Sequence, residues 1–163
     1  MSARGPRLVL LGKQGAGKGT QATRLADHYH VAHLSTGDLF RDAANHGHAL
    51  GIEAKRFMDR GELVPDETVL GLVEEHLKVD DRAGRGFVLD GFPRTRRQAE
   101  ELERILAGRP LDLAIDLDVP TEIVLHRIAG RRVCSQCGAL YHIDNPPKEN
   151  WTCDVCGGRV EQR

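Results

Sequence analysis

The stretch at residues 12–20, GKQGAGKGT, constrains the fold of this chain more than any other. It follows an apolar run at 8–11 and precedes a segment with helical spacing. A helix N-terminus has free N–H groups and roughly half a positive charge, so it attracts a phosphate wherever glycines let the backbone approach closely. Gly12, four further residues and then Gly17-Lys18 fit the G-x-x-x-x-G-K pattern. The pattern predicts a nucleotide-phosphate loop between a strand and a helix.

Lys18 is the residue of this loop that we expect to neutralise the β- and γ-phosphates. Gly19 stands where the general pattern has Ser or Thr, and the hydroxyl arrives one residue later, at Thr20. The alternative is a glycine-rich turn without a ligand, but the strand before it and the helix after it favour phosphate binding.

Strand-like and helix-like segments alternate along the first 118 residues. The expected strands are at 7–11, 32–35, 87–90 and 114–118, and the segments with helical periodicity are at 18–29, 36–60, 66–78 and 95–107. Such alternation predicts an α/β fold with a parallel sheet flanked by helices. Pro120 can open another helix to about residue 130, after which glycine, proline, asparagine and paired cysteines indicate a small second module.

Composition excludes several functional classes. The chain has 163 residues with 23 basic against 24 acidic side chains, so it lacks the basic footprint of a nucleic-acid-binding protein or a polybasic membrane anchor. It has no apolar run long enough to span a membrane, and the apolar stretch near the N-terminus is too short for a signal peptide. We therefore expect a cytoplasmic protein without nucleic-acid or membrane partners.

The four cysteines form two C-x-x-C pairs, Cys134 with Cys137 and Cys153 with Cys156. The spacing between the pairs predicts a zinc ribbon, and four thiolates would close the coordination shell, so the zinc would be structural. Two disulfides are the alternative, which is disfavoured because nothing indicates export. His142 is interpreted as a surface or packing residue rather than a further ligand.

Two further segments place polar residues where strands end. LSTGDLFR at 34–41 includes Ser35 and Thr36, either of which could be only a helix N-cap. FVLDGFPRT at 87–95 ends an apolar strand with Asp90, the kind of residue that organises Mg²⁺ opposite a phosphate loop, and then turns to present Arg94. A purely structural turn is the alternative for this second segment.

Five motifs in this order, GKQGAGKGTQ, LSTGDLFR, MDRGELVPDE, LDGFPRTRRQA and GRRVC, resemble bacterial adenylate kinases whose lid carries a four-cysteine metal site. The resemblance covers nearly the whole chain from residue 7 onward. It implies a P-loop nucleoside monophosphate kinase fold and a monomer that reversibly transfers the terminal phosphoryl group of Mg-ATP to AMP, giving two ADP. It also implies a core at 1–35 and 67–130, an AMP-binding domain at 36–66 and a zinc-binding lid at 131–163.

The resemblance assigns roles to individual residues. Its ATP-binding residues are Gly15, Ala16, Gly17, Lys18, Gly19, Thr20 and Arg127. Its AMP-binding residues are Thr36, Arg41, Glu62, Leu63, Val64, Gly91, Arg94, Gln98 and Arg163, the last of which also matches a lid arginine. Its catalytic residues are Lys18, Asp90, Arg94, Arg127 and Arg131, with Asp90 as the partner of a Mg²⁺-bound water. Gln14 stands where the family commonly has proline, and we expect little effect from that difference.

Arg127 and Arg131 are four residues apart in the segment that leads into the cysteine module, so we expect both on one helix face. By themselves these two arginines would be interpreted as part of a solvent-exposed charged helix face. The resemblance instead implies that they contact the ATP phosphates.

The family pattern continues past residue 163 with a further strand and helices, so we expect a fragment that lacks the C-terminal part of the core. Such a chain is expected to have an uncovered sheet edge, to aggregate readily and to be at best weakly active. Two other functions remain open. One is a UMP or CMP kinase, and the other is a zinc-ribbon binding module that uses the nucleotide as a switch. Against the module, residues 134–163 contain only Tyr141 and Trp151 as aromatics and no basic cluster.

Overall fold

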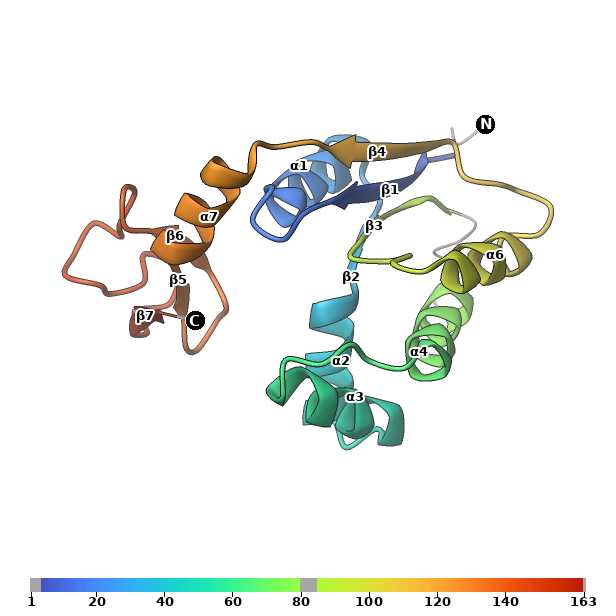
Figure 1. Ribbon diagram of the computed structural model, residues 1–163, viewed down its shortest axis with the longest axis horizontal. Coiled ribbons are helices and arrows are strands. Elements are labelled where there is room, and N and C mark those ends of the chain that lie inside the picture. The colour runs from blue at the N-terminus through green and yellow to red at the C-terminus, as the bar shows by residue number, and fades with distance from the viewer. Residues whose placement is uncertain (1–3, 80–84, 163) are drawn as a thin grey trace. The chain divides into compact units, whose positions relative to one another are not determined.

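The computed structural model describes residues 4–79 and 85–162, and Figure 1 shows its elements. The chain divides into two compact units. We call Met1–Gly12 with Gly17–Leu117 the sheet unit, and Lys13–Ala16 with Asp118–Arg163 the cysteine unit. Residues 36–66, expected as a separate AMP-binding domain, lie within the sheet unit, and the helix after residue 120 lies within the cysteine unit.

The sheet unit is built on four parallel strands in the order β2-β3-β1-β4. The strands are β1 (Arg7–Gly12), β2 (Ala32–Ser35), β3 (Phe87–Asp90) and β4 (Leu113–Leu117). The four predicted strands are therefore present, with end residues that differ by at most one position. β1 and β3 are the central strands, and their near-continuous apolar runs are buried, as expected for a parallel sheet covered on both faces.

Apolar side chains alternate between the two faces of this sheet. Val9 and Leu89 pack in one core cluster with side chains from the helices α2, α3, α4 and α6, whereas Leu8, Leu10 and Val88 pack with α1. The helices are α1 (Lys18–Tyr29), α2 (Thr36–Asn45), α3 (Ala49–Asp59), α4 (Asp66–Val79) and α6 (Arg96–Ile105). Helices on both faces confirm the predicted α/β layering.

The segment at 36–60, which its periodicity presents as continuous, is two helices rather than one. α2 ends at Asn45, and Gly47 with a positive φ lies in the turn before α3 begins at Ala49. The two helices approach so closely that a Cβ on Gly51 would lie 2.4 Å from the Ala43 carbonyl carbon. Helical periodicity alone does not detect such a turn, because both halves bury their apolar face in the same core.

The cysteine unit contains one helix and a small antiparallel sheet. α7 (Thr121–Gly130) leads directly into β5 (Arg131–Cys134), which pairs with β6 (Leu140–His142) and β7 (Val160–Gln162) in the order β6-β5-β7. The buried cluster of this sheet consists of Cys134, Cys153 and Val160. In the part of the chain that the structure describes, no helix has both the length and the apolar character needed to cross a membrane.

Candidate nucleotide-binding site

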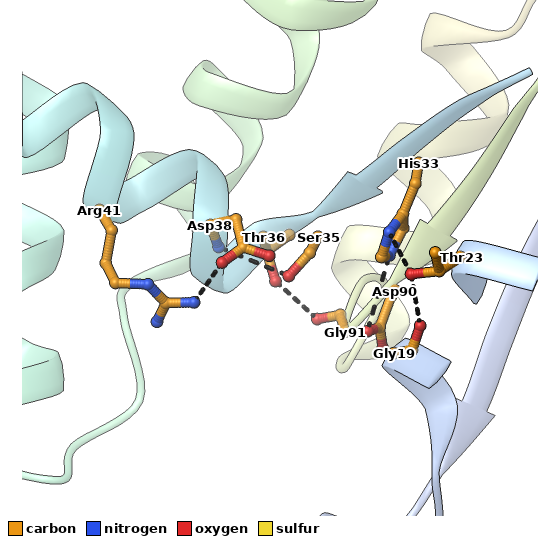
Figure 2. A network of polar contacts seen from close by, with 9 residues as sticks. All are labelled: Gly19, Thr23, His33, Ser35, Thr36, Asp38, Arg41, Asp90 and Gly91. Carbon is orange, nitrogen blue, oxygen red and sulfur yellow. Dashed lines mark hydrogen bonds and ion pairs between the residues drawn. The ribbon is translucent and has the colours of Figure 1, made fainter. Parts of the chain in front are cut away.

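The carboxyl ends of β1, β2 and β3 bring the polar candidates of the sheet unit to one edge. In the strand register Asp90 of β3 lies between Leu10 of β1 and Ser35 of β2. Parallel strands all present their carboxyl ends at the same edge, which is where ligands of open α/β sheets bind. Figure 2 shows the polar network at this edge, formed by Gly19, Thr23, His33, Ser35, Thr36, Asp38, Arg41, Asp90 and Gly91.

The glycine-rich loop runs from β1 to the N-terminus of α1 as predicted. Gly17 is the N-cap of α1 with φ 101°, a left-handed conformation that favours glycine, and no side chain caps the helix there. No acidic residue occupies the first turn either, so the positive end of the helix dipole is not compensated locally. Lys18 Nζ donates a hydrogen bond to the Gly12 carbonyl, 2.8 Å away. This arrangement of N–H groups and an ammonium suits a bound phosphate.

Gly19, which stands where the general pattern has a hydroxyl residue, lies beside Asp90. A Cβ on Gly19 would lie 3.4 Å from Asp90 Oδ2, so a larger side chain at position 19 would point at this carboxylate. Thr20, the next residue, is exposed on α1. A carboxylate beside a phosphate loop offers the hard oxygen ligands that Mg²⁺ prefers, so Asp90 fits a magnesium ion or one of its waters.

His33 is a member of this network that the sequence interpretation missed. Its Nε2 lies 3.9 Å from Asp90 Oδ2 and its Nδ1 lies 3.5 Å from the hydroxyl of Thr23 on α1. The Nε2 atom is buried and finds no hydrogen-bond partner among the described residues. The alternation of side chains along β2 could have identified it. Successive residues of a strand face opposite sides of the sheet. Leu34 packs with α2, α3, α4 and α6, so His33 faces the α1 side.

Thr36, Gly91 and Arg94 form a second cluster at the same edge. The Thr36 hydroxyl and Arg94 Nε both donate to the Gly91 carbonyl, at 3.2 and 2.7 Å. Gly91 has φ 80°, and a Cβ there would lie 3.0 Å from both the Thr36 hydroxyl and an Arg94 nitrogen. A side chain at position 91 would therefore push these two groups apart, which is why glycine is required.

The N-cap alternative for the LSTGD segment is confirmed for Ser35, whose hydroxyl accepts from the Asp38 backbone N–H at 3.4 Å. Arg41 pairs with Asp38 one turn along α2. Burial by itself would raise the pKa of Asp38, but hydrogen bonds with Arg41 and Ser35 outweigh it, so the pKa lies below its usual value. Arg41 is thus held by a carboxylate beside the first turn of α2.

Gln98 is almost fully buried, and both the oxygen and the nitrogen of its side-chain amide form hydrogen bonds within the protein. Its Oε1 accepts from the Arg94 backbone N–H at 2.7 Å, and its Nε2 donates to Asp66 Oδ1 at 2.6 Å. Thr95 caps α6 by accepting from the Gln98 N–H and also donates to Asp66. The sequence interpretation missed Thr95, although T-x-x-Q before a helix is the pattern of a capping box.

The remaining AMP candidates are less closely tied to this network. Glu62, Leu63 and Val64 lie in the loop between α3 and α4, where Glu62 pairs with Arg60 and Leu63 is 74% exposed. Arg163 lies outside the described residues.

Within the cysteine unit, Arg127 Nη1 donates to the carbonyl of Ala16, which lies in the 13–16 segment of the same unit, at 3.0 Å. The expectation that Arg127 and Arg131 share a helix face is wrong. α7 ends at Gly130, and Arg131 is the first residue of β5 with extended backbone, where it pairs with His142. Residues four apart share a face only within one helix, so the spacing of Arg127 and Arg131 across the end of α7 does not place them on the same face.

The four cysteine sulfurs of the cysteine unit converge on one point. Sγ atoms of Cys134 and Cys156 lie 3.5 Å apart, those of Cys137 and Cys153 lie 3.6 Å apart, and all four lie within 4.8 Å of one another. Tetrahedral zinc with bonds of about 2.3 Å places its sulfurs about 3.8 Å apart, so the four thiols fit this metal. A hydrogen bond from the Tyr141 hydroxyl lowers the pKa of Cys153 to about 6, which favours the thiolate form that metals bind.

A parallel sheet whose first strand passes through a phosphate loop into a helix, with an aspartate at the end of the neighbouring strand, defines a P-loop nucleotide-binding protein. Comparison with known proteins is more specific. The family model described as adenylate kinase matches residues 10–155. The chain belongs to the adenylate kinase family.

Several curated relatives carry the name adenylate kinase. Those of Geobacillus sp. (strain WCH70) and Bacillus subtilis (strain 168) are each 52% identical over 159 residues, which is 96% of this chain and 73% of each relative. One from Clostridium botulinum (strain Loch Maree / Type A3) is 51% identical over 160 residues, or 96% of this chain and 74% of the relative.

Proposed function

We propose that this chain carries the chemistry of an adenylate kinase, the reversible transfer of the γ-phosphoryl group of Mg-ATP to AMP that yields two ADP. The observation that carries the proposal lies within the sheet unit. Lys18 at the start of α1, the Asp90 carboxylate and the cluster of Thr36, Gly91 and Arg94 all stand at the carboxyl ends of three adjacent parallel strands. Family membership supports the same reaction.

In this reaction an oxygen of the AMP phosphate attacks the γ-phosphorus of ATP, while the bond from that phosphorus to the bridging oxygen of ADP breaks. The protein contributes alignment and charge neutralisation rather than covalent chemistry. Lys18 and the N–H groups at the start of α1 would hold the ATP phosphates, with Gly15, Ala16, Gly17, Gly19 and Thr20 forming the rest of the loop. Arg127 and Arg131 are proposed to add positive charge to the same phosphates.

The acceptor is proposed to bind at Thr36, Arg41, Gly91 and Arg94, with the 62–64 backbone and Arg163 completing its contacts. Arg94 is a planar donor fork held at its Nε by Gly91, which leaves its terminal nitrogens for a phosphate. Gln98 supports Arg94 through the backbone bond described above, so we propose that it positions this arginine as well as contacting AMP.

Two metal ions belong to the proposal. Mg²⁺ would enter with ATP, screen the phosphate charges and be oriented by Asp90. Zn²⁺ would be held by Cys134, Cys137, Cys153 and Cys156 and would stabilise the cysteine unit without entering the chemistry, because four thiolates leave no open position. ATP, AMP and ADP are the proposed partners. From the sequence resemblance alone, we further propose that the protein works as a monomer in the cytoplasm.

The test is ADP formation by the purified chain with ATP and Mg²⁺, offered AMP, UMP or CMP in separate reactions. We expect turnover with AMP at least roughly a hundredfold above that with UMP or CMP, because a site that hydrogen-bonds one base rejects others strongly. Arg94→Ala should abolish most of this activity. Arg96→Ala is the matched control, since Arg96 is highly exposed and pairs with Glu100 on the helix surface. Preference for UMP or CMP would replace the proposal with the alternative kinase.

A further inference from the structure

A second group of metal-ligand side chains lies in the cysteine unit, separate from the four cysteines. His126 on α7, His142 at the end of β6 and Asp144 in the following turn bring one ring nitrogen each and a carboxylate oxygen to within 4.8 Å of one another. Asp144 Oδ2 is the shared centre, 2.7 Å from His126 Nε2 and 3.2 Å from His142 Nδ1. The fold brings α7 together with the strand β6 and the turn that follows it, and these carry the three groups.

We propose that His126, His142 and Asp144 form a binding site for a late first-row divalent cation such as Ni²⁺ or Zn²⁺. Two imidazoles and one carboxylate are a donor set that these cations accept, with a water completing the shell. Ligands about 2.1 Å from a tetrahedral ion stand about 3.4 Å apart, so the two spacings from Asp144 Oδ2, 2.7 and 3.2 Å, need to open by less than an ångström. The proposal is independent of the nucleotide reaction.

His142 is oriented as a metal ligand would be. Its Nε2 faces the His126 carbonyl at 3.4 Å, and donation to that oxygen leaves the lone pair on Nδ1, the nitrogen that faces Asp144. A second nitrogen bonded to a backbone carbonyl is the usual support of a metal-binding histidine. Nδ1 now accepts the Asp144 backbone N–H at 3.2 Å, and a bound cation would replace this hydrogen bond.

Backbone packing fixes the ring further. A Cβ on Gly130 would lie 2.2 Å from His142 Nε2, so the imidazole lies directly against the glycine that ends α7. The Ile143 N–H donates to the Gly130 carbonyl at 2.9 Å, and the turn closes through hydrogen bonds between His142 and Asn145. The side chains of His126 and Asp144, in contrast, are 61% and 63% exposed, so a cation can reach them from solvent.

The experiment titrates the zinc-loaded chain with Ni²⁺ near pH 7.5, following heat by calorimetry and released zinc by mass spectrometry. We expect about one equivalent of Ni²⁺ to bind without zinc release, and His126 and His142 ring protons to be broadened in NMR spectra. His126→Ala and Asp144→Asn each change an exposed ligand and should weaken Ni²⁺ binding by roughly tenfold or more.

His46→Ala is the matched control, because His46 forms an exposed pair with Asp42 alone. It should leave Ni²⁺ affinity unchanged. His142 is left intact because its packing against Gly130 makes a substitution there affect folding. Equal Ni²⁺ affinity in the chain with native residues and in both ligand variants would overturn the proposal, as would binding that releases stoichiometric zinc or that is lost in His46→Ala.

Discussion

The sheet unit and the cysteine unit are stabilised in different ways. In the sheet unit, Phe87, Val88 and Leu89 are fully buried between helices on both faces of the sheet. Among the described residues, the buried cluster around the sheet of the cysteine unit consists of Cys134, Cys153 and Val160, while Leu125 and Val155 of this unit are 61% and 75% exposed. Apolar burial holds the first unit, whereas a module this small is expected to need the proposed zinc site for its stability.

Because the two units are stabilised differently, substitutions in the sheet unit and in the cysteine unit should affect activity and stability differently. The groups proposed to contact the reacting phosphates in the sheet unit stand at the end of a rigid sheet, so removing one should reduce activity without unfolding. The cysteines are proposed to stabilise the cysteine unit through zinc without an open coordination position, so removing them should lower stability and leave the chemistry unchanged. The predictions below test this separation, beginning with the largest expected effect.

Lys18→Ala should reduce phosphoryl transfer by on the order of a hundredfold or more, because a positioned charge on the migrating group is lost. The melting temperature should change little, since the side chain is not part of the apolar core. A coupled ADP assay and a thermal melt measure the two effects. Lys13→Ala is the control within the same loop, its ammonium lying 3.0 Å from the Thr121 hydroxyl. Comparable turnover in Lys18→Ala would sink the assignment of the loop.

Replacing Cys134 and Cys137 by serine should abolish stoichiometric zinc and lower the melting temperature of the cysteine unit. Nucleotide preference should stay the same, because a closed thiolate site supplies no chemistry. Metal analysis, thermal melts and the AMP, UMP and CMP assay check the three parts. Zinc retained at about one equivalent would show that its ligands lie elsewhere.

Phe87→Ala should lower the free energy of unfolding of the sheet unit by about 3–5 kcal/mol, because it opens a cavity under a fully buried ring. Zinc affinity should be unaffected, since the cysteine unit is held separately. Urea unfolding and a chelator competition for zinc measure these effects. Leu113→Ala on β4, where the side chain is 55% exposed, is the control and should cost much less. Weakened zinc binding in Phe87→Ala would contradict the separation of the two units.

His33→Leu should raise the Mg²⁺ concentration needed for half-maximal activity by a few-fold up to roughly tenfold, because Asp90 loses a polar ring 3.9 Å from its Oδ2 and gains an apolar neighbour. His33→Gln retains an N–H donor and should recover most of this loss. Magnesium titrations of activity, with direct Mg²⁺-ATP binding as a second readout, distinguish this role from simple packing. Equal magnesium dependence in the Leu and Gln variants would remove His33 from the site.

Asp38→Asn should have the smallest effect, below about 1 kcal/mol, because both Asp38 and Arg41 are substantially exposed. The pKa of Asp38 is lowered in the folded protein, so its contribution is present above the unfolded value near 3.9 and is lost as pH falls through the lower folded value. Urea midpoints for both proteins should differ at pH 6 and converge as the pH falls through the lowered folded pKa of Asp38. Asp42→Asn on the same helix is the control. Urea midpoints of Asp38→Asn and of the native sequence that move further apart on acidification would contradict the lowered pKa of Asp38.

The sequence by itself determined the elements that depend on local pattern. The phosphate loop, the four strands of the sheet and the C-x-x-C pairs are visible because glycine, apolar runs and cysteine spacing act over a few residues. The end of α7 near residue 130 was predicted as well. The turn between α2 and α3 was missed, because it accompanies the close packing of Gly51 against Ala43.

Only the tertiary structure decided which polar groups meet. Strand register pairs Ser35 with Asp90, and the His33 ring reaches to 3.9 Å from the Asp90 carboxylate, 57 positions along the chain. The β6 turn brings His142 and Asp144 to His126. The tertiary structure also shows that the Gln98 side chain forms hydrogen bonds with the backbone N–H of Arg94 and with the carboxylate of Asp66. The physical reason is that a parallel sheet or a hairpin aligns residues distant in sequence through backbone hydrogen bonds, whose register the local pattern does not encode.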